Sequence, residues 1–134
     1  MRRSRLGESR MPPAGIAIRS HKRKDGCATA FAYAGREKVG AIGACPLGDR
    51  LHISSVEVLE SYRRQGIATA LYEALARRAC SDRLRLASYS WERNRLSSAF
   101  WDKQVAKGRA VVERDYTVLV DTCGVASLAG PRKR

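Results

Sequence analysis

Apolar and polar residues alternate with a period of two over the first part of the chain, a pattern typical of β-strands with one buried face. The alternation predicts strands over residues 15–19, 28–33, 38–44 and 50–58. Turns are expected at residues 20–26, which end in Asp25-Gly26, and at residues 46–49. The alternation slips at Ser54-Ser55, which predicts a bulge or a bend in the fourth strand.

The period changes to about 3.6 after residue 66, which predicts a helix over residues 66–80. Its apolar face consists of Ile67, Ala70, Leu71, Ala74, Leu75 and Ala79. A strand over 84–89 follows, and then a second helix over 94–107 with Asn94 as its N-cap and Leu96, Phe100 and Trp101 as its apolar residues. Strands over 110–113 and 116–121 precede a loop-like tail. This order predicts a mixed α/β domain around one sheet.

The chain of 134 residues has a net charge of +13, which is concentrated at its ends. Residues 1–24 contain eight Lys or Arg residues and one acid, and residues 132–134 contain three more cations. We therefore divide the chain into a disordered basic tail (1–13), one domain (14–124) and a basic tail (125–134). Such tails attract polyanions, so nucleic acid is a candidate partner; solvated ends that only aid solubility are the alternative.

No stretch has the roughly 18 consecutive apolar residues that a membrane span needs, and the basic N-terminus lacks the apolar run of a secretory signal. We expect a cytoplasmic protein without a membrane partner. Four cysteines lie far apart, at positions 27, 45, 80 and 123. This spacing fits no zinc site and no clear disulfide framework, so reduced, mostly buried thiols and no metal are expected.

The junction of the fourth strand and the first helix reads S-Y-R-R-Q-G-I-A-T-A, over residues 61–70. The first N–H groups of a helix lack intrahelical partners, and the helix dipole adds positive charge there. Gly66 lets the backbone approach a bulky ligand closely, and Arg63 and Arg64 add cations. The junction therefore suits a diphosphate, although a helix that begins with glycine after a basic turn is also common.

The longer segment V-E-V-L-E-S-Y-R-R-Q-G-I-A-T-A-L-Y-E-A-L, residues 56–75, resembles the acetyl-CoA-binding motif of the Gcn5-related N-acetyltransferase (GNAT) superfamily. Arg63, Gly66 and Ala68 match its Q/R-x-x-G-x-G/A pattern position by position. N-R-L-S-S-A-F-W-D-K, residues 94–103, resembles a second helix motif of this family. The resemblance covers residues 28–121 and implies a mostly antiparallel sheet with two main helices and two splayed strands.

The resemblance also implies how acetyl-CoA, a co-substrate, would be bound. The backbone amides of residues 65–69 would hold the diphosphate, and the backbone of Val56 and Val58 would bind the pantetheine arm, with Asn94 beside it. The implied cofactor-binding residues are Val56, Val58, Arg63, Arg64, Gln65, Gly66, Ile67, Ala68, Thr69 and Asn94. The implied reaction is direct attack of a neutral amine on the thioester.

The catalytic residues of the family are only partly matched. His52 stands where many members have a glutamate base, and imidazole titrates near pH 6.5, so His52 is the candidate base. The alternative is that His52 is structural and solvent takes the proton. Glu57 ranks below His52 as a candidate base, because it lies between Val56 and Val58 and its side chain should point to the opposite face from theirs. Trp101 stands where the family has a tyrosine as general acid, so Tyr116, with Tyr89 and Ser97 as further options, is the candidate acid; the alternative is that solvent protonates the thiolate.

The chain also lacks the two helices that family members place between their first two strands. The acceptor side should therefore be open, which suits a bulky amine such as a protein lysine, a protein N-terminus or an aminoacyl-tRNA, unless a second subunit closes it. The predicted function is N-acetyl transfer to a primary amine. The alternatives are a domain that binds CoA without catalysis, or a nucleic-acid-binding protein that uses its basic tails.

Overall fold

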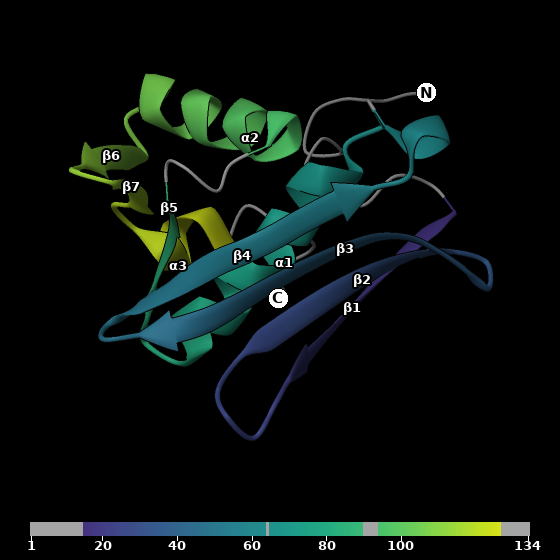
Figure 1. Ribbon diagram of the computed structural model, residues 1–134, viewed down its shortest axis with the longest axis horizontal. Helices are drawn as coiled ribbons and strands as arrows, with labels where there is room; N and C mark the ends of the chain where they lie inside the picture. The colour runs from purple at the N-terminus through teal and green to yellow at the C-terminus, as the bar shows by residue number, and fades with distance from the viewer. Residues whose placement is uncertain (1–14, 64, 90–93, 127–134) are drawn as a thin grey trace.

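A computed structural model describes residues 15–63, 65–89 and 94–126 (Figure 1). Arg64 and the tails over 1–13 and 127–134 therefore lie outside the described residues. The strands are β1 (Ile16–Lys22), β2 (Ala28–Ala34), β3 (Glu37–Leu47), β4 (Arg50–Val58), β5 (Arg85–Tyr89), β6 (Ala110–Glu113) and β7 (Tyr116–Leu119). The helices are η2 (Glu60–Tyr62), α1 (Ile67–Ser81), α2 (Arg95–Ala106) and α3 (Thr122–Ala126).

One sheet connects all seven strands in the order β1-β2-β3-β4-β5-β7-β6. Every neighbouring pair is antiparallel except β4 and β5, which are parallel and are connected through α1. The predicted mostly antiparallel sheet with two main helices is thus confirmed. Four residues of β4, Arg50–Ile53, pair with β5, and β4 then continues to Val58 paired with β3 only. The two strands therefore separate where the acetyl-CoA arm was expected.

The predicted irregularity at Ser54-Ser55 is confirmed by the pairing of β3 with β4. Gly43 faces Ser55 and Ala44 faces Ile53, so Ser54 is the extra residue of a bulge. The bulge keeps Ile53 and Val56 on the same buried face although they are three residues apart.

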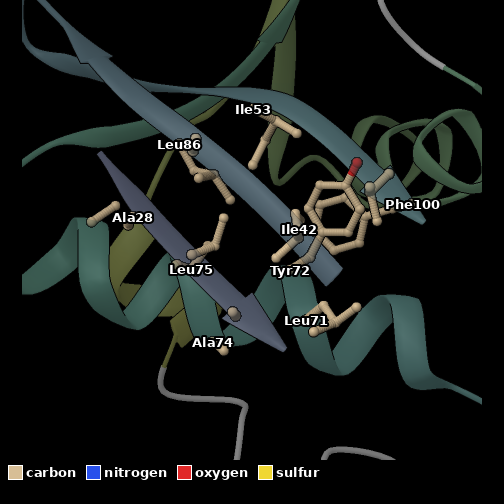
Figure 2. Packing of buried hydrophobic residues seen from close by; sticks show 14 of the residues in the cluster. Ala28, Ile42, Ile53, Leu71, Tyr72, Ala74, Leu75, Leu86 and Phe100 are labelled. Atoms are coloured by element: carbon tan, nitrogen blue, oxygen red, sulfur yellow. The ribbon is translucent and has the colours of Figure 1, made fainter. Parts of the chain in front are cut away.

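Helix α1 covers one face of the sheet (Figure 1), and its six predicted apolar residues are all buried. Leu71 and Leu75 point toward the strands, and the ring of Tyr72 stacks on Phe100 of α2 at a centroid distance of 4.0 Å (Figure 2). Trp101 is fully buried and packs edge-on against Phe100. Alanines of β2 make room for α1, because Ala28, Ala30 and Ala32 are at most 1% exposed.

Several predicted boundaries differ from the structure. Strand β1 continues to Lys22, through the first residues of the predicted turn, because it pairs with β2 over its full length. Strand β3 continues past Pro46; β2 pairs with β3 only as far as Ala44, so Pro46 has a strand on one side only. The tail after Leu119 is not simply loop-like, because α3 packs on α1 and runs to Ala126, beyond the predicted domain boundary.

The expectation of four reduced thiols is wrong in this structure. Cys27 is bonded to Cys45, and Cys80 is bonded to Cys123. The first pair lies opposite in the β2–β3 ladder, one residue beyond the pairing of Ala28 with Ala44, and the second joins the end of α1 to α3. Both contacts are tertiary, so sequence spacing could not reveal them.

Candidate functional site

The N-terminus of α1 opens into a cavity that is larger than the one beside Val56 and Asn94. Gly66 is the N-cap with φ +81°, a left-handed conformation that favours glycine, and it has no side chain to cap the helix. The first intrahelical bond is donated by the N–H of Ala70 to the carbonyl of Gly66, at 3.0 Å. The N–H groups before Ala70 therefore have no partner within the helix. A Cβ on Gly66 would meet no atom within 4 Å, so this position faces open space.

This cavity measures about 290 Å³ and lies between the start of α1 and the side of α2. Its lining includes Gly66, Ile67, Ala68 and Thr69 from α1 and its cap. The charged residues of the lining are Arg63, Lys103, Lys107 and Arg109, with Glu73 as the one carboxylate. Four cations and the positive end of a helix dipole in one cavity create a site for an anion with several charges.

The end of β4 directs backbone groups away from β3. The N–H of Leu59 donates to the carbonyl of Val39 at 2.9 Å, so this pair is hydrogen-bonded. Hydrogen-bonded and non-bonded pairs alternate along an antiparallel ladder, so Val58 and Val56, opposite Gly40 and Ile42, belong to non-bonded pairs. Their N–H and C=O groups therefore point toward the side where β5 has separated.

Two side-chain donors already reach these carbonyls. The Nδ2 of Asn94 donates to the carbonyl of Val56 at 2.8 Å, and the Nε of Arg63 donates to the carbonyl of Val58 at 2.9 Å. Both predicted residues thus lie at the strand end. The N–H groups of Val56 and Val58 face the same gap and can donate to a carbonyl of a ligand.

Asn94 also organises the start of α2. Its Oδ1 accepts the N–H of Ser97 at 3.0 Å, and the Oγ of Ser97 accepts the N–H of Asn94 at 2.9 Å, which forms a capping box. The predicted N-cap is confirmed. Since the hydroxyl of Ser97 also donates to the carbonyl of Asn94 at 3.2 Å, it has a structural role in the cap.

A second cavity of about 140 Å³ lies beside this gap. Its lining comprises Ile53, Ser54, Ser55, Val56, Glu57, Ser88, Asn94 and Ser97. Hydroxyls and one exposed carboxylate thus surround the point where the two strands separate. A cation or a polar amine fits this chemistry better than an anion does.

The candidate catalytic residues His52 and Tyr116 are close to each other, with ring centroids 5.7 Å apart. His52 is 8% exposed and stacks on Tyr89 at 4.4 Å. The guanidinium of Arg50 lies 4.2 Å from the ring centre of Tyr116 and donates to Glu113 at 2.6 Å. Neither His52 nor Tyr116 lines either of the two cavities. Glu57, which the sequence ranked lower, lines the smaller one.

Sequence reasoning missed the contribution of α2 to the larger cavity. Lys103 and Gln104 lie in its second half, Lys107 is its C-cap, and Arg109 follows. The i, i+4 spacing of Lys103 and Lys107 was the available signal, because it places both cations on one side of a helix. Sequence alone did not show that this side faces the start of α1. Among the described residues, no group of three metal-binding side chains is found, and no helix is long and apolar enough to span a membrane.

The sequence matches the model of the acetyltransferase (GNAT) family over residues 3–106. The chain therefore belongs to this family of acetyltransferases. No curated protein matches the sequence.

Several solved structures share this fold. A GNAT acetyltransferase from Elizabethkingia anophelis with acetyl-CoA bound is 15% identical, with a TM-score of 0.54 over 79% of this chain and 96% of that chain. AAC(6')-Iy, in complex with a bisubstrate analogue of CoA and acetylneamine, is 18% identical, with a TM-score of 0.54 over 74% and 93%. PaiA N-acetyltransferase from Thermoplasma acidophilum, in complex with CoA, is 15% identical, with a TM-score of 0.53 over 69% and 58%.

Proposed function

We propose that this protein is an N-acetyltransferase that moves the acetyl group of acetyl-CoA to a primary amine of a bulky acceptor. The observation that carries the proposal is the order in which the two cavities lie along β4. A cationic cavity at the start of α1 adjoins Val58, and β4 leads from there to the smaller, polar cavity at Val56 and Asn94. This order matches a cofactor with a phosphate end and a reactive thioester end.

Different groups of the site would bind different parts of acetyl-CoA. The amides before Ala70 and the four cations would hold the diphosphate, since charge-assisted hydrogen bonds are the strong ones. The N–H groups of Val56 and Val58 would bind the arm and polarise the thioester carbonyl. Fixing both reactants in line contributes as much as any single group.

The transfer itself needs one proton to leave the amine. The amine nitrogen bonds to the acetyl carbon, the C–S bond breaks, and CoA departs as a thiolate that takes a proton from solvent. We assign the removal of the amine proton to Glu57, because Glu57 lines the smaller cavity and its carboxylate also attracts an ammonium group. His52 and Tyr116 then support the sheet beside the site, since each packs in the aromatic cluster.

An acetylation assay tests this proposal. The full chain is incubated with acetyl-CoA and, separately, a lysine peptide with a blocked N-terminus, a peptide with a free N-terminus, spermidine and neamine, and products are identified by mass spectrometry. We expect acetylation of at least one amine. Acetyl-CoA binding without acetylation of any of the four would contradict the proposed activity and favour a domain that binds CoA without catalysis.

The sequence predicts a cytoplasmic location for this protein. Disulfides are rare in the cytosol, so the two disulfides of the structure argue for an oxidising compartment instead. Alkylation of thiols at the moment of cell lysis, followed by mass spectrometry, distinguishes the two. Four alkylated cysteines would support the cytoplasm, and none would contradict it.

A further inference from the structure

The face of β1–β3 opposite α1 carries aromatic and cationic side chains together. Phe31 and Tyr33 of β2 are half-buried, with ring centroids 6.4 Å apart, and His21 lies 6.1 Å from Phe31. Arg19 lies over Tyr33 at 5.7 Å, and the Nζ of Lys38 lies over Phe31 at 4.6 Å. We call these five residues the aromatic face.

No described helix covers this face, because α1 packs on the other side of the sheet (Figure 1). The side of the strands that packs on α1 is defined by Ala28, Ala30 and Ala32, which alternate with Phe31 and its neighbours. A Cβ on Gly40 would lie 3.2 Å from Leu71 of α1, which places β3 in the same orientation. The aromatic face therefore points to solvent among the described residues.

The charge around this face is positive on balance. Residues 15–38 contain six Lys or Arg residues and two acids. Of these acids, Asp25 pairs with Arg23 at 3.2 Å, and Glu37 faces Ala34 across the ladder, on the opposite side from the aromatic side chains. Ala41 continues the row of Arg19 and Phe31 across the sheet, and Glu57, beyond it on β4, is the first carboxylate.

Charge excludes the two occupants that the chain itself could supply. A second copy related by two-fold symmetry would bring the cations of one face, Arg19 and Lys38, against the same cations of the other, and like charges that face each other are unfavourable. The N-terminal residues 1–14 carry four arginines and one glutamate, so the same repulsion applies to them. A polyanion is complementary instead.

We propose that the aromatic face binds single-stranded nucleic acid. Phe31 and Tyr33 offer rings on which bases stack, as sheet faces with adjacent aromatic residues do in single-strand binding domains. Arg19 and Lys38 are exposed, so they can leave the rings for phosphates when bases take their place. Flat stacking needs unpaired bases, which is why the face suits a single strand rather than a duplex. This inference is independent of the acetyltransferase activity.

Fluorescence anisotropy of the full chain with labelled oligouridylate tests the inference, with a duplex of the same length and polyglutamate as competitors. Phe31→Leu and Tyr33→Leu keep apolar side chains but remove the rings, and each should weaken binding about five-fold or more. Val112→Ala, an exposed apolar residue of β6, is the matched control and should leave it unchanged. Arg19→Gln should weaken binding and reduce the magnitude of the slope of log affinity against log salt concentration by about one. Arg77→Gln, at an exposed position of α1, should do neither.

The outcomes separate the face from the tails. Ring-dependent binding that prefers the single strand supports the inference. If Phe31→Leu and Tyr33→Leu leave binding unchanged, the nucleic acid binds the basic tails and the inference is wrong. The inference is also overturned if the protein does not bind the oligouridylate, binds the duplex equally well, or is competed equally well by polyglutamate. Dimerisation that Phe31→Leu abolishes, measured by light scattering, would show that a second copy occupies the face instead. Acetyl-CoA titration of the same variants should give the parent affinity and confirms that they are folded.

Discussion

Asn94 makes two contacts that can be separated by substitution. Its Oδ1 caps α2 and its Nδ2 reaches β4. Asn94→Ala removes both, and we expect the free energy of unfolding to fall by about 2 kcal/mol, from about 1 for the cap and about 1 for the hydrogen bond. Asn94→Asp keeps the cap acceptor and loses the donor, so it should cost about half as much. Denaturant unfolding measures both, and equal stability of the parent and Asn94→Ala would refute the bridging role.

Glu57 and His52 compete for the role of base, and paired substitutions decide between them. If Glu57 takes the proton, Glu57→Gln should lower kcat by about 100-fold or more and leave acetyl-CoA affinity unchanged. Glu57→Asp should restore part of the rate. His52→Gln should lower stability rather than kcat, because His52 stacks on Tyr89. The reverse pattern would assign the base to His52, as the sequence first indicated.

Among the elements, α2 contributes cations that the family motif does not specify. Lys103→Gln and Lys107→Gln should each weaken acetyl-CoA binding about three- to ten-fold, because each removes a positive charge from the lining of the larger cavity. Arg95→Gln on the first turn of the same helix is the control, since Arg95 lies outside the cavity lining. Calorimetric titration measures all three. Equal losses in all of them would mean that only the overall charge matters.

Helix α3 is joined to α1 by the disulfide between Cys80 and Cys123, which are 43 residues apart. Replacement of both cysteines by alanine should lower the free energy of unfolding by about 3–4 kcal/mol. The double replacement of Cys27 and Cys45, 18 residues apart, should also lower the free energy of unfolding. This loss should be smaller than that for Cys80 and Cys123, by less than about 1 kcal/mol. Neither pair lines a cavity, so acetyl-CoA affinity should be retained. A Cys80/Cys123 variant as stable as the parent would contradict a role in anchoring α3.

Over the whole molecule, the sequence predicted what depends on local pattern. Periodicity placed both main helices, and the slip at Ser54-Ser55 placed the bulge. Periodicity carries no information on contacts between distant segments. These contacts determine the disulfides, the length of β1 and which side of α2 faces the larger cavity. The motif at Gly66 predicted the proposed phosphate site because its chemistry is local, whereas the ranking of Glu57 depends on the separation of β4 from β5.

The central claim is that the start of α1 binds the diphosphate of acetyl-CoA, and calorimetric titration of Gly66 variants tests it most directly. Gly66→Gln and Gly66→Glu share the cost of a left-handed residue, about 1 kcal/mol, and differ only in charge. We predict that the parent binds acetyl-CoA, that Gly66→Gln binds it more weakly, and that Gly66→Glu loses a further factor of about 100 or more. Equal affinities of the two variants, or no binding by the parent, would contradict the account.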